Sequence, residues 1–316
     1  MTTPINIVGA GMAGLLAAEI FRGESVTVTD AQASLPDNHG ALLRFRSDAV
    51  ARETKQDFQR VVVTKGVKVR REVRNVATIT AINQYAHKVS GTIAERSIMN
   101  LDPVARYIAP DDFLARLAGN KKIYFNEPWT ANDFKSLSRA SPPVISTVPM
   151  PMMMKLVGWD VPEDAFQWRA IYSVTGTLTR IPVNVFQTIY YPDPALPFYR
   201  ASITGNRLII EYLTDIPPDL GWVGKVLEDF GIPLAARGVD NLGYKRQSYG
   251  KLVRADEAMR REFILAMTDQ YNLYSVGRFA TWRQILLDDV VQDIHLVRRM
   301  IMERSHYTRH LRAFSK

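Results

Sequence analysis

Three glycines near the start of the chain, Gly9, Gly11 and Gly14, constrain the fold more than any other feature of the sequence. They follow a short apolar stretch, INIVG, that is typical of a buried parallel strand, and they precede a run of Ala and Leu that favours a helix. A second stretch rich in β-branched residues, SVTVTD, ends at Asp30. This order of strand, glycine turn, helix and strand predicts the first part of a Rossmann-type dinucleotide-binding unit.

Each glycine of this turn has a separate mechanical role. The first permits the tight turn from strand to helix, the second lets the backbone approach a diphosphate, and the third lets the helix pack closely on the strand. The N–H groups at the start of the helix, around Met12 and Ala13, favour the negative charge of a phosphate. Asp30 ends the second strand, where an acidic side chain can accept hydrogen bonds from a ribose. A glycine-rich turn without a ligand is the alternative.

The composition is that of a globular chain with a basic balance. Its 316 residues, 47% of them hydrophobic, suffice for a sizeable core and suggest about two domains. The chain has no cysteine, which excludes disulfides, thiolate metal sites and cysteine nucleophiles. With neither a signal segment nor an apolar run of the roughly 18 residues that a membrane span needs, a cytoplasmic location is expected. The 40 Lys and Arg against 32 Asp and Glu favour anionic partners.

Three later stretches bear on which dinucleotide is expected. NHGALLRFRS, residues 38–47, comes soon after the second strand. PPVISTVPMP, residues 142–151, contains a strand that two prolines stop. NLYSVGRFATW, residues 272–282, precedes a long helix with acids near its start and arginines nearer its end, a polarity that suits the helix dipole.

With these stretches in this order, the chain resembles the flavoprotein superfamily that contains UDP-galactopyranose mutase and the flavin amine oxidases. The resemblance implies an α/β fold in which a Rossmann-type FAD-binding domain is interleaved with a second domain built on an antiparallel sheet. It implies FAD as the cofactor, with the Gly-Arg turn at the diphosphate and the start of the long helix over the flavin ring. The glycine turn and the resemblance together predict these cofactor contacts: Gly9, Gly11, Met12, Ala13, Gly14, Asp30, Gly40, Ala41, Leu42, Thr147, Gly277, Arg278, Asp288, Asp289 and Val290.

The sequence departs from the mutase pattern after the Gly-Arg turn. Trp282 and Gln284 stand where the mutases carry tyrosines, and Leu286 stands where they carry an aspartate; Asp288 matches the last acid of the pattern. Because these positions help the mutases to bind a sugar nucleotide, the departure argues against mutase activity itself.

The expected FAD-binding domain is discontinuous and comprises residues 1–50, 111–158 and 266–300. The substrate domain takes residues 51–110 and 159–265, and residues 301–316 form a basic C-terminal tail. In the substrate domain, alternating patterns predict strands over residues 60–82, 183–191 and 198–213, and Gly205 with Asn206 favours a turn between antiparallel strands. Residues 219–232 read as an amphipathic helix that ends near Gly231.

Candidate substrate contacts come from arginines and aromatic residues. Guanidinium groups bind phosphate or carboxylate in bidentate fashion, and tyrosine rings can stack on a base. The residues concerned are Arg44, Arg169, Arg200, Tyr190, Tyr191, Tyr199 and, through the resemblance, Trp282. His39 and Arg44 are also weak candidates for a catalytic role beside the flavin. A sheet whose aromatic residues fill a core and whose arginines face water is the alternative, and the five histidines show no metal-binding spacing.

The leading hypothesis is an FAD-dependent oxidoreductase that transfers a hydride between flavin N5 and a C–N or C–O bond of a small anionic or nucleotide-bearing substrate. Three alternatives stay open. They are a mutase-like, non-redox flavin enzyme on a sugar nucleotide, a flavoenzyme that modifies bases or base adducts in nucleic acid, and a dinucleotide-binding protein without catalysis. The basic, aromatic-bearing segment 298–316 motivates the nucleic-acid alternative. The oligomeric state is left open.

Overall fold

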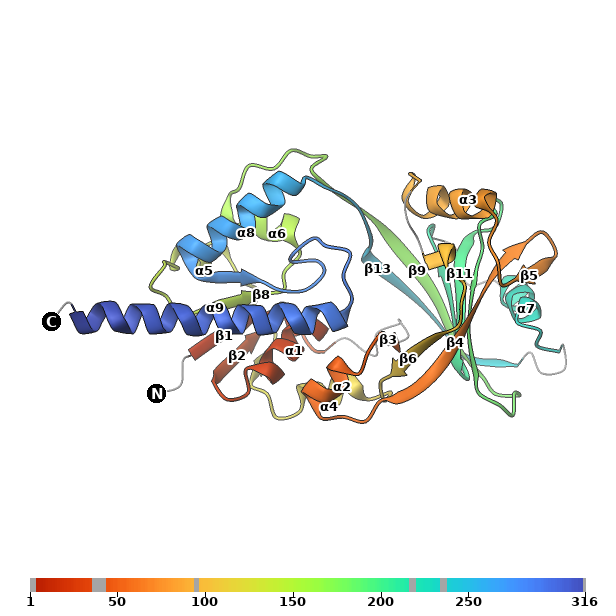
Figure 1. Ribbon diagram of the computed structural model, residues 1–316, viewed down its shortest axis with the longest axis horizontal. Coiled ribbons are helices and arrows are strands. Elements are labelled where there is room, and N and C mark those ends of the chain that lie inside the picture. The colour runs from red at the N-terminus through yellow and green to blue at the C-terminus, as the bar shows by residue number, and fades with distance from the viewer. Residues whose placement is uncertain (1–3, 36–43, 94–96, 216–219, 234–237, 315–316) are drawn as a thin grey trace.

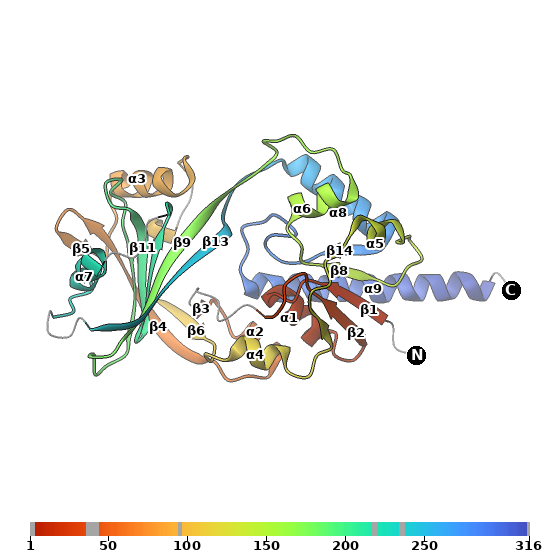
Figure 2. The same cartoon turned by 180° about the vertical axis from the view of Figure 1, so that it is seen from behind.

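The computed structural model describes residues 4–35, 44–93, 97–215, 220–233 and 238–314, with side chains as far as Arg304. The molecule is elongated, with a helix-covered parallel sheet at one end and a larger curved sheet at the other (Figure 1). The view from behind shows the same two parts, joined by long strands and by the start of the C-terminal helix (Figure 2).

The first sheet has five strands, all parallel to their neighbours, in the order β14-β8-β1-β2-β7. Its strands are short, and they come from three distant parts of the chain. They are β1 (Pro4–Val8), β2 (Ser25–Thr29), β7 (Ile123–Tyr124), β8 (Val144–Ser146) and β14 (Leu273–Ser275).

Helices cover both faces of this sheet because its strands alternate between two apolar sides. Ile5 and Ile7 of β1 belong to a core with the helices of one face, whereas Val8 belongs to a core with the helices of the other. The helices of the first face are α1 (Met12–Ile20), α2 (Ala49–Thr54), α4 (Phe113–Ala118) and α9 (Leu287–Phe314). Those of the second face are α5 (Ala131–Lys135), α6 (Met150–Val157) and α8 (Glu257–Tyr271).

The second sheet is mixed and has the strand order β13-β9-β12-β11-β10-β4-β6-β3, with β5 beside β4. All its pairs are antiparallel except β10 with β4. Its strands are β3 (Arg44–Phe45), β4 (Gln59–Val69), β5 (Glu72–Arg74), β6 (Val104–Ile108), β9 (Phe166–Leu178), β10 (Val185–Tyr190), β11 (Phe198–Gly205), β12 (Arg207–Tyr212) and β13 (Val239–Ala255).

Two helices pack on opposite faces of the second sheet. Val226 and Leu227 of α7 (Leu220–Asp229) pack against one face of β9 to β12, and Tyr85 of α3 (Ile79–Ser90) packs against Tyr190 and Tyr199 on the other. A single turn of 3-10 helix (Ser97–Met99) follows α3. The part of the sheet that α3 leaves uncovered on its own face carries the polar residues described below.

The expected fold class is confirmed: a parallel Rossmann-type sheet is interleaved along the chain with a largely antiparallel second sheet. One local expectation is wrong. Residues 79–82 were expected to continue a strand, but they begin α3, because the Thr78 side chain caps the helix by accepting a hydrogen bond from the backbone N–H of Ala81 at 3.2 Å. The turn expected at Gly205 and Asn206 is confirmed, and it separates the antiparallel strands β11 and β12.

Residues 301–314 continue α9 without a break, so the expected basic tail is the end of a long helix in this structure. This helix extends beyond the parallel sheet on the side away from the second sheet (Figure 1). The expected domain boundaries are not tested further and stay predictions. Within the described residues, no helix is long and apolar enough to cross a membrane.

Gly14 decides how closely α1 packs on β1. A Cβ atom at this position would lie 1.9 Å from the carbonyl oxygen of Gly9, a contact that only a shift of the helix could relieve. We therefore expect Gly14→Ala to lower the free energy of unfolding by about 1–3 kcal/mol, measured by urea denaturation of protein stripped of bound ligands.

Gly11→Ala is the matched control, because a Cβ there would meet no atom within 4 Å. Its free energy of unfolding should change by less than about 0.5 kcal/mol. Equal losses in the two variants would contradict the packing role assigned to Gly14.

Candidate functional site

The turn after β1 is held in place by a neighbour from the middle of the chain. Gly9 adopts a positive φ of 103°, and a Cβ on it would lie 2.1 Å from Oγ1 of Thr147. That hydroxyl donates to the carbonyl oxygen of Val8 at 3.0 Å, and the Thr147 backbone N–H donates to the same oxygen at 2.9 Å. Gly9 is therefore required both by its own backbone conformation and by the approach of the turn after β8.

The turn after β14 reaches the same place from the C-terminal part of the chain. Gly277 has a φ of 97°, and a Cβ on it would lie 2.8 Å from Cβ of Ala13 in the first turn of α1. The backbone N–H of Val276 donates to the carbonyl oxygen of Ser146 at 2.9 Å. The turns that follow β1, β8 and β14 thus lie side by side at the carboxyl ends of neighbouring strands, where ligands of open α/β sheets bind.

Gly11 differs from Gly9 and Gly277 because, among the described residues, nothing requires a glycine there. It is the N-cap of α1, with a φ of −71° that any residue adopts, and a Cβ on it would meet nothing within 4 Å. The first helical bond runs from the backbone N–H of Leu15 to the carbonyl oxygen of Gly11 at 2.9 Å. The missing side chain leaves open space beside the first N–H groups of the helix, the place where a diphosphate can approach.

Asp30 supports the same turn. One carboxylate oxygen accepts a hydrogen bond from the backbone N–H of Ala10 at 2.5 Å, and the other accepts from Gln32 at 2.8 Å. The carboxylate therefore lies against the glycine turn, the position from which it can also accept a hydrogen bond from a ribose.

Arg278 connects the C-terminal turn to the second sheet. Its guanidinium donates to the carbonyl oxygen of Gly250 on β13, at 3.4 Å, and lies over the ring of Phe279, 5.6 Å from the centroid. Its predicted contact with a diphosphate stays a prediction.

Hydrogen bonds connect the start of α9 to the residues that directly follow β3. The Asp288 carboxylate accepts hydrogen bonds from the backbone N–H groups of Arg46 and Ser47, at 3.1 and 2.8 Å, and from the Ser47 hydroxyl at 2.7 Å. Asp289 accepts from the backbone N–H of Leu286 at 2.8 Å and pairs with the Arg46 guanidinium at 3.0 Å. Val290 is 1% exposed, in the core.

The expectation that the start of α9, near residues 288–290, lies over the flavin ring stays a prediction. The carboxylate of Asp288 accepts hydrogen bonds from the backbone N–H and the hydroxyl of Ser47, and the Val290 side chain packs in the core. Only the backbone at the start of α9 is left for a contact of the kind that the resemblance implies.

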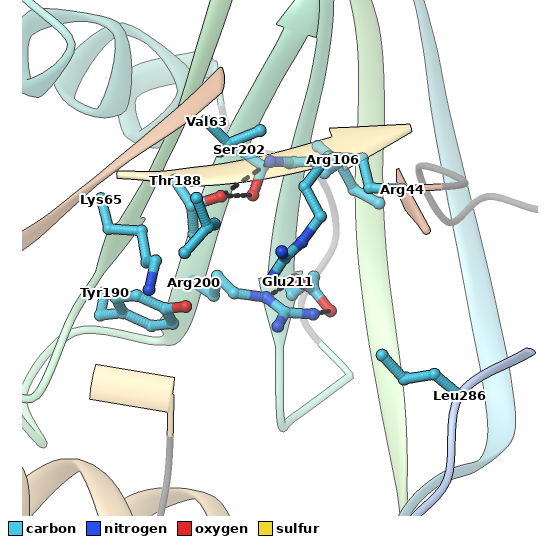
Figure 3. Close-up of a pocket in the computed structure, with 12 residues that line it drawn as sticks. Arg44, Val63, Lys65, Arg106, Thr188, Tyr190, Arg200, Ser202, Glu211 and Leu286 are labelled. Atoms are coloured by element: carbon cyan, nitrogen blue, oxygen red, sulfur yellow. Dashed lines mark hydrogen bonds and ion pairs between the residues drawn. The ribbon is translucent and has the colours of Figure 1, made fainter. Parts of the chain in front are cut away.

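A cavity of about 340 Å³ lies on the second sheet, on the face opposite α7, and its polar side chains point into a common space (Figure 3). Six strands and the residue before α9 contribute to it. It is lined by Arg44, Val63, Lys65, Val104, Arg106, Thr188, Tyr190, Arg200, Ser202, Ile209, Glu211 and Leu286.

One arginine of the cavity is neutralised by Glu211, the one carboxylate among the described residues that line it. The Arg200 guanidinium donates to Glu211 through two nitrogens, one of them at 2.7 Å, and the hydroxyl of Tyr199 donates to the same carboxylate at 2.8 Å. Burial alone would raise the pKa of Glu211, but the charge of Arg200 and these hydrogen bonds lower that pKa to about 2. Burial alone would lower the pKa of Arg200, but Glu211 holds that pKa well above its usual value.

The three other cations of the cavity share no such partner. Arg44 donates to the hydroxyl of Thr188 at 3.0 Å, and Lys65 donates to the carbonyl oxygen of Asn100 at 2.7 Å. Burial, reinforced by the charge of Arg200, lowers the pKa of Arg44 to about 10, so that the group is still charged at neutral pH. Burial also lowers the pKa values of Lys65 and Arg106.

The structure separates the predicted substrate residues into three groups: cavity residues, one exposed residue and core residues. Arg44, Tyr190 and Arg200 line the cavity, as a substrate role requires. Arg169 lies on β9, exposed and outside the cavity lining. His39, Gly40, Ala41 and Leu42 fall outside the described residues.

The three remaining aromatic candidates are core residues, which corrects the expectation that they contact substrate. Tyr191 is 0% exposed, and its ring packs on Phe198 at 4.6 Å between centroids. Tyr199 is also 0% exposed; its hydroxyl donates to Glu211, and its ring lies under the Arg200 guanidinium, 5.7 Å from the centroid. Trp282 is 3% exposed and donates to the carbonyl oxygen of Arg254 at 2.9 Å.

Sequence reasoning missed Lys65, Arg106 and Glu211. Each occupies an alternate position of its strand, two residues after an apolar lining residue: Val63, Val104 and Ile209. The alternation of apolar and polar residues was visible in the sequence. Which of these side chains share one face of the sheet depends on how β4 pairs with β6 and β10, and the sequence does not show that pairing. Among the described residues, no group of three or more His, Cys, Asp or Glu side chains is placed to hold a metal ion.

Solved structures of low sequence identity share the whole fold. Putrescine oxidase bound to putrescine superposes with a TM-score of 0.58 at 9% identity, over 96% of this chain and 99% of that chain. An oxidoreductase from Methanosarcina mazei gives 0.54 at 11% identity, over 94% and 100%. A tryptophan halogenase from Shewanella frigidimarina gives 0.51 at 12% identity, over 99% and 76%. No protein-family model matches the sequence, and no curated protein matches it either.

The low pKa of Glu211 predicts a specific loss of stability in acid. Because the folded-state pKa is about 2 against an ordinary value of 4.5, the ionised carboxylate stabilises the fold above about pH 4.5, and this contribution is lost as the pH falls toward 2. The full contribution is on the order of 3 kcal/mol.

The measurement is the difference in free energy of unfolding between wild type and Glu211→Gln. The glutamine cannot titrate and leaves Arg200 buried without its carboxylate, so the variant should be less stable at neutral pH. The difference between the two proteins should shrink as the pH is lowered to about 3. A difference that does not change with pH would show that the pKa of Glu211 is the same in the folded and the unfolded protein.

Proposed function

We propose that this protein is an FAD-dependent oxidoreductase that transfers a hydride between flavin N5 and a small anionic substrate. The observation that carries the proposal is the open space at Gly11. Neither the backbone conformation nor the packing requires a glycine there, although the neighbouring turns at Gly9 and Gly277 are packed against protein. A ligand that approaches the start of α1 accounts for this difference.

The residues of the three turns fit the diphosphate and the ribose of FAD. The first N–H groups of α1 would bind the diphosphate, and Gly277 lets the C-terminal turn close over the start of that helix. Asp30 would accept a hydrogen bond from the ribose next to the adenine.

The shared fold supports redox chemistry in place of simple binding. Two of the proteins with this fold are an oxidase and an oxidoreductase, and the superposition with them covers at least 94% of this chain. When bound, a flavin supplies a hydride acceptor, so the protein's part is to hold and orient the substrate.

The cavity on the second sheet is the place where this chain would hold the substrate. Leu286 lines the cavity and directly precedes α9. Arg44 of β3 also lines the cavity, and Arg46, just after β3, pairs with Asp289 in the first turn of α9. The substrate would thus be bound between the cations of the sheet and the helix that packs on α1. The cations bind a negatively charged group, and the apolar side chains Val63, Val104 and Ile209 exclude water from the same space.

We expect purified protein to show the visible absorption of a flavin, and we expect heat to release FAD that mass spectrometry identifies. Gly11→Val should lose most of the bound FAD, because its side chain fills the space in front of α1. The matched control is Gly224→Val in α7, where a Cβ also meets nothing within 4 Å. Colourless wild-type protein that takes up no added FAD would refute the cofactor assignment.

For the reaction, we expect an anionic amine or hydroxy acid to bleach the flavin in the absence of oxygen, and the uncharged analogue to do so much more weakly. Arg44→Gln should lower kcat/KM for the anionic compound at least tenfold, because a charge-assisted hydrogen bond contributes about 1.5–3 kcal/mol. Kinetics measured under anaerobic conditions test this. Flavin turnover without net oxidation would favour the non-redox alternative.

A further inference from the structure

The cavity on the second sheet carries more positive charge than its own carboxylate can neutralise. Four cations and one acid line it, and the acid is committed to Arg200. Among the described residues, no carboxylate lies within ion-pair distance of Arg44, Lys65 or Arg106. Keeping three like charges partly buried costs free energy, which a bound anion would offset.

The three cations act on one common space. They lie on the adjacent strands β3, β6 and β4, and Figure 3 shows their side chains around the same opening. The charge of Arg106 lowers the pKa of both Lys65 and Arg44, after the larger effect of burial, so the groups interact electrostatically. Thr188 and Ser202, whose hydroxyl oxygens are 2.9 Å apart, add neutral donors beside Arg44.

This arrangement selects among anions by shape and charge. A single carboxylate is planar, and one bidentate arginine can neutralise it, as Arg200 does for Glu211 beside the hydroxyl of Tyr199. Three cationic groups on three strands instead match an anion that has several terminal oxygens in different directions and more than one negative charge. A phosphate monoester has three such oxygens and a charge between about −1.5 and −2 at neutral pH.

We propose that this cavity binds a phosphate monoester group of the substrate through Arg44, Lys65 and Arg106. This inference rests on the proposed function and names the substrate class of the same site. Leu286 lies at the other side of the cavity from Lys65 and Tyr190 (Figure 3), so the phosphate occupies the Lys65 side and the reacting part of the substrate extends toward α9. Arg200 and Glu211 form the fixed, neutral wall between these two ends.

The test is calorimetric titration of the full chain, as purified, with inorganic phosphate. We expect one site in wild type, and Lys65→Met and Arg106→Met should each weaken phosphate binding at least tenfold. Arg60→Met is the matched control: Arg60 lies on the same strand as Lys65, but it is exposed and outside the cavity, and the variant loses the same charge. Its affinity should stay within about twofold of wild type.

Two further titrations examine the chemistry of the anion. Phosphate should bind more tightly as the pH rises through its second pKa, about 6 for a phosphate ester, while sulfate of the same shape should show no such change. Acetate and malonate should bind at least tenfold more weakly than phosphate. Malonate that binds more tightly than phosphate, or Lys65→Met and Arg106→Met variants that bind phosphate as wild type does, would overturn the proposal.

The outcome is independent of the flavin because heat of binding is the readout. A colourless protein with an intact, Lys65-dependent phosphate site would refute the proposed function and leave the anion site standing. A yellow protein that binds FAD but shows no phosphate site would refute the anion site and leave the cofactor assignment standing.

Discussion

The close approach of three backbone turns at one end of the parallel sheet is the constraint on which the rest of the structure depends. Gly9 lies against the hydroxyl of Thr147, Gly14 lies against the carbonyl oxygen of Gly9, and Gly277 lies against Ala13. A side chain at Gly9 or Gly277 would separate elements that are far apart in the sequence, and one at Gly14 would push α1 away from the preceding turn. The contacts fix α1 on β1 and bring the turn before α9 to the start of α1, so the N–H groups of that helix face a defined space.

The second sheet is connected to this space by polar contacts. Asp288 accepts hydrogen bonds from the backbone of Arg46 and Ser47, and Asp289 accepts one from the Arg46 side chain, so the start of α9 is bonded to the residues that follow β3. The cavity that begins at Arg44 is therefore held at a set position relative to the parallel sheet. Its cations lie on neighbouring strands, where their mutual repulsion is tolerated because the β-ladder fixes the backbone.

Local sequence patterns predicted the elements that depend on local chemistry. The glycine turn and the strands and helix around it are of this kind. Prediction was wrong where a cap outweighed a β-rich pattern, as at Thr78, and where aromatic residues beside cavity residues turned out to face a core, as Tyr191 does. Side chains alternate between the two faces of a strand. A correctly predicted strand therefore does not reveal which of two neighbouring side chains faces a ligand, unless the orientation of the strand in the sheet is known.

The sequence by itself determined the Rossmann-type unit, because the conformations of Gly9 and the packing of Gly14 follow from residue type at fixed spacing. It also determined the excess of positive charge. Only the tertiary structure decided which charges gather. The pairing of β4 with β6 and β10 sets Lys65 and Arg106 beside Arg44, and a bulge between Phe198 and Arg200 brings both Tyr199 and Arg200 to Glu211. Those contacts join residues up to about 150 positions apart, and strand register, which no local pattern encodes, fixes them.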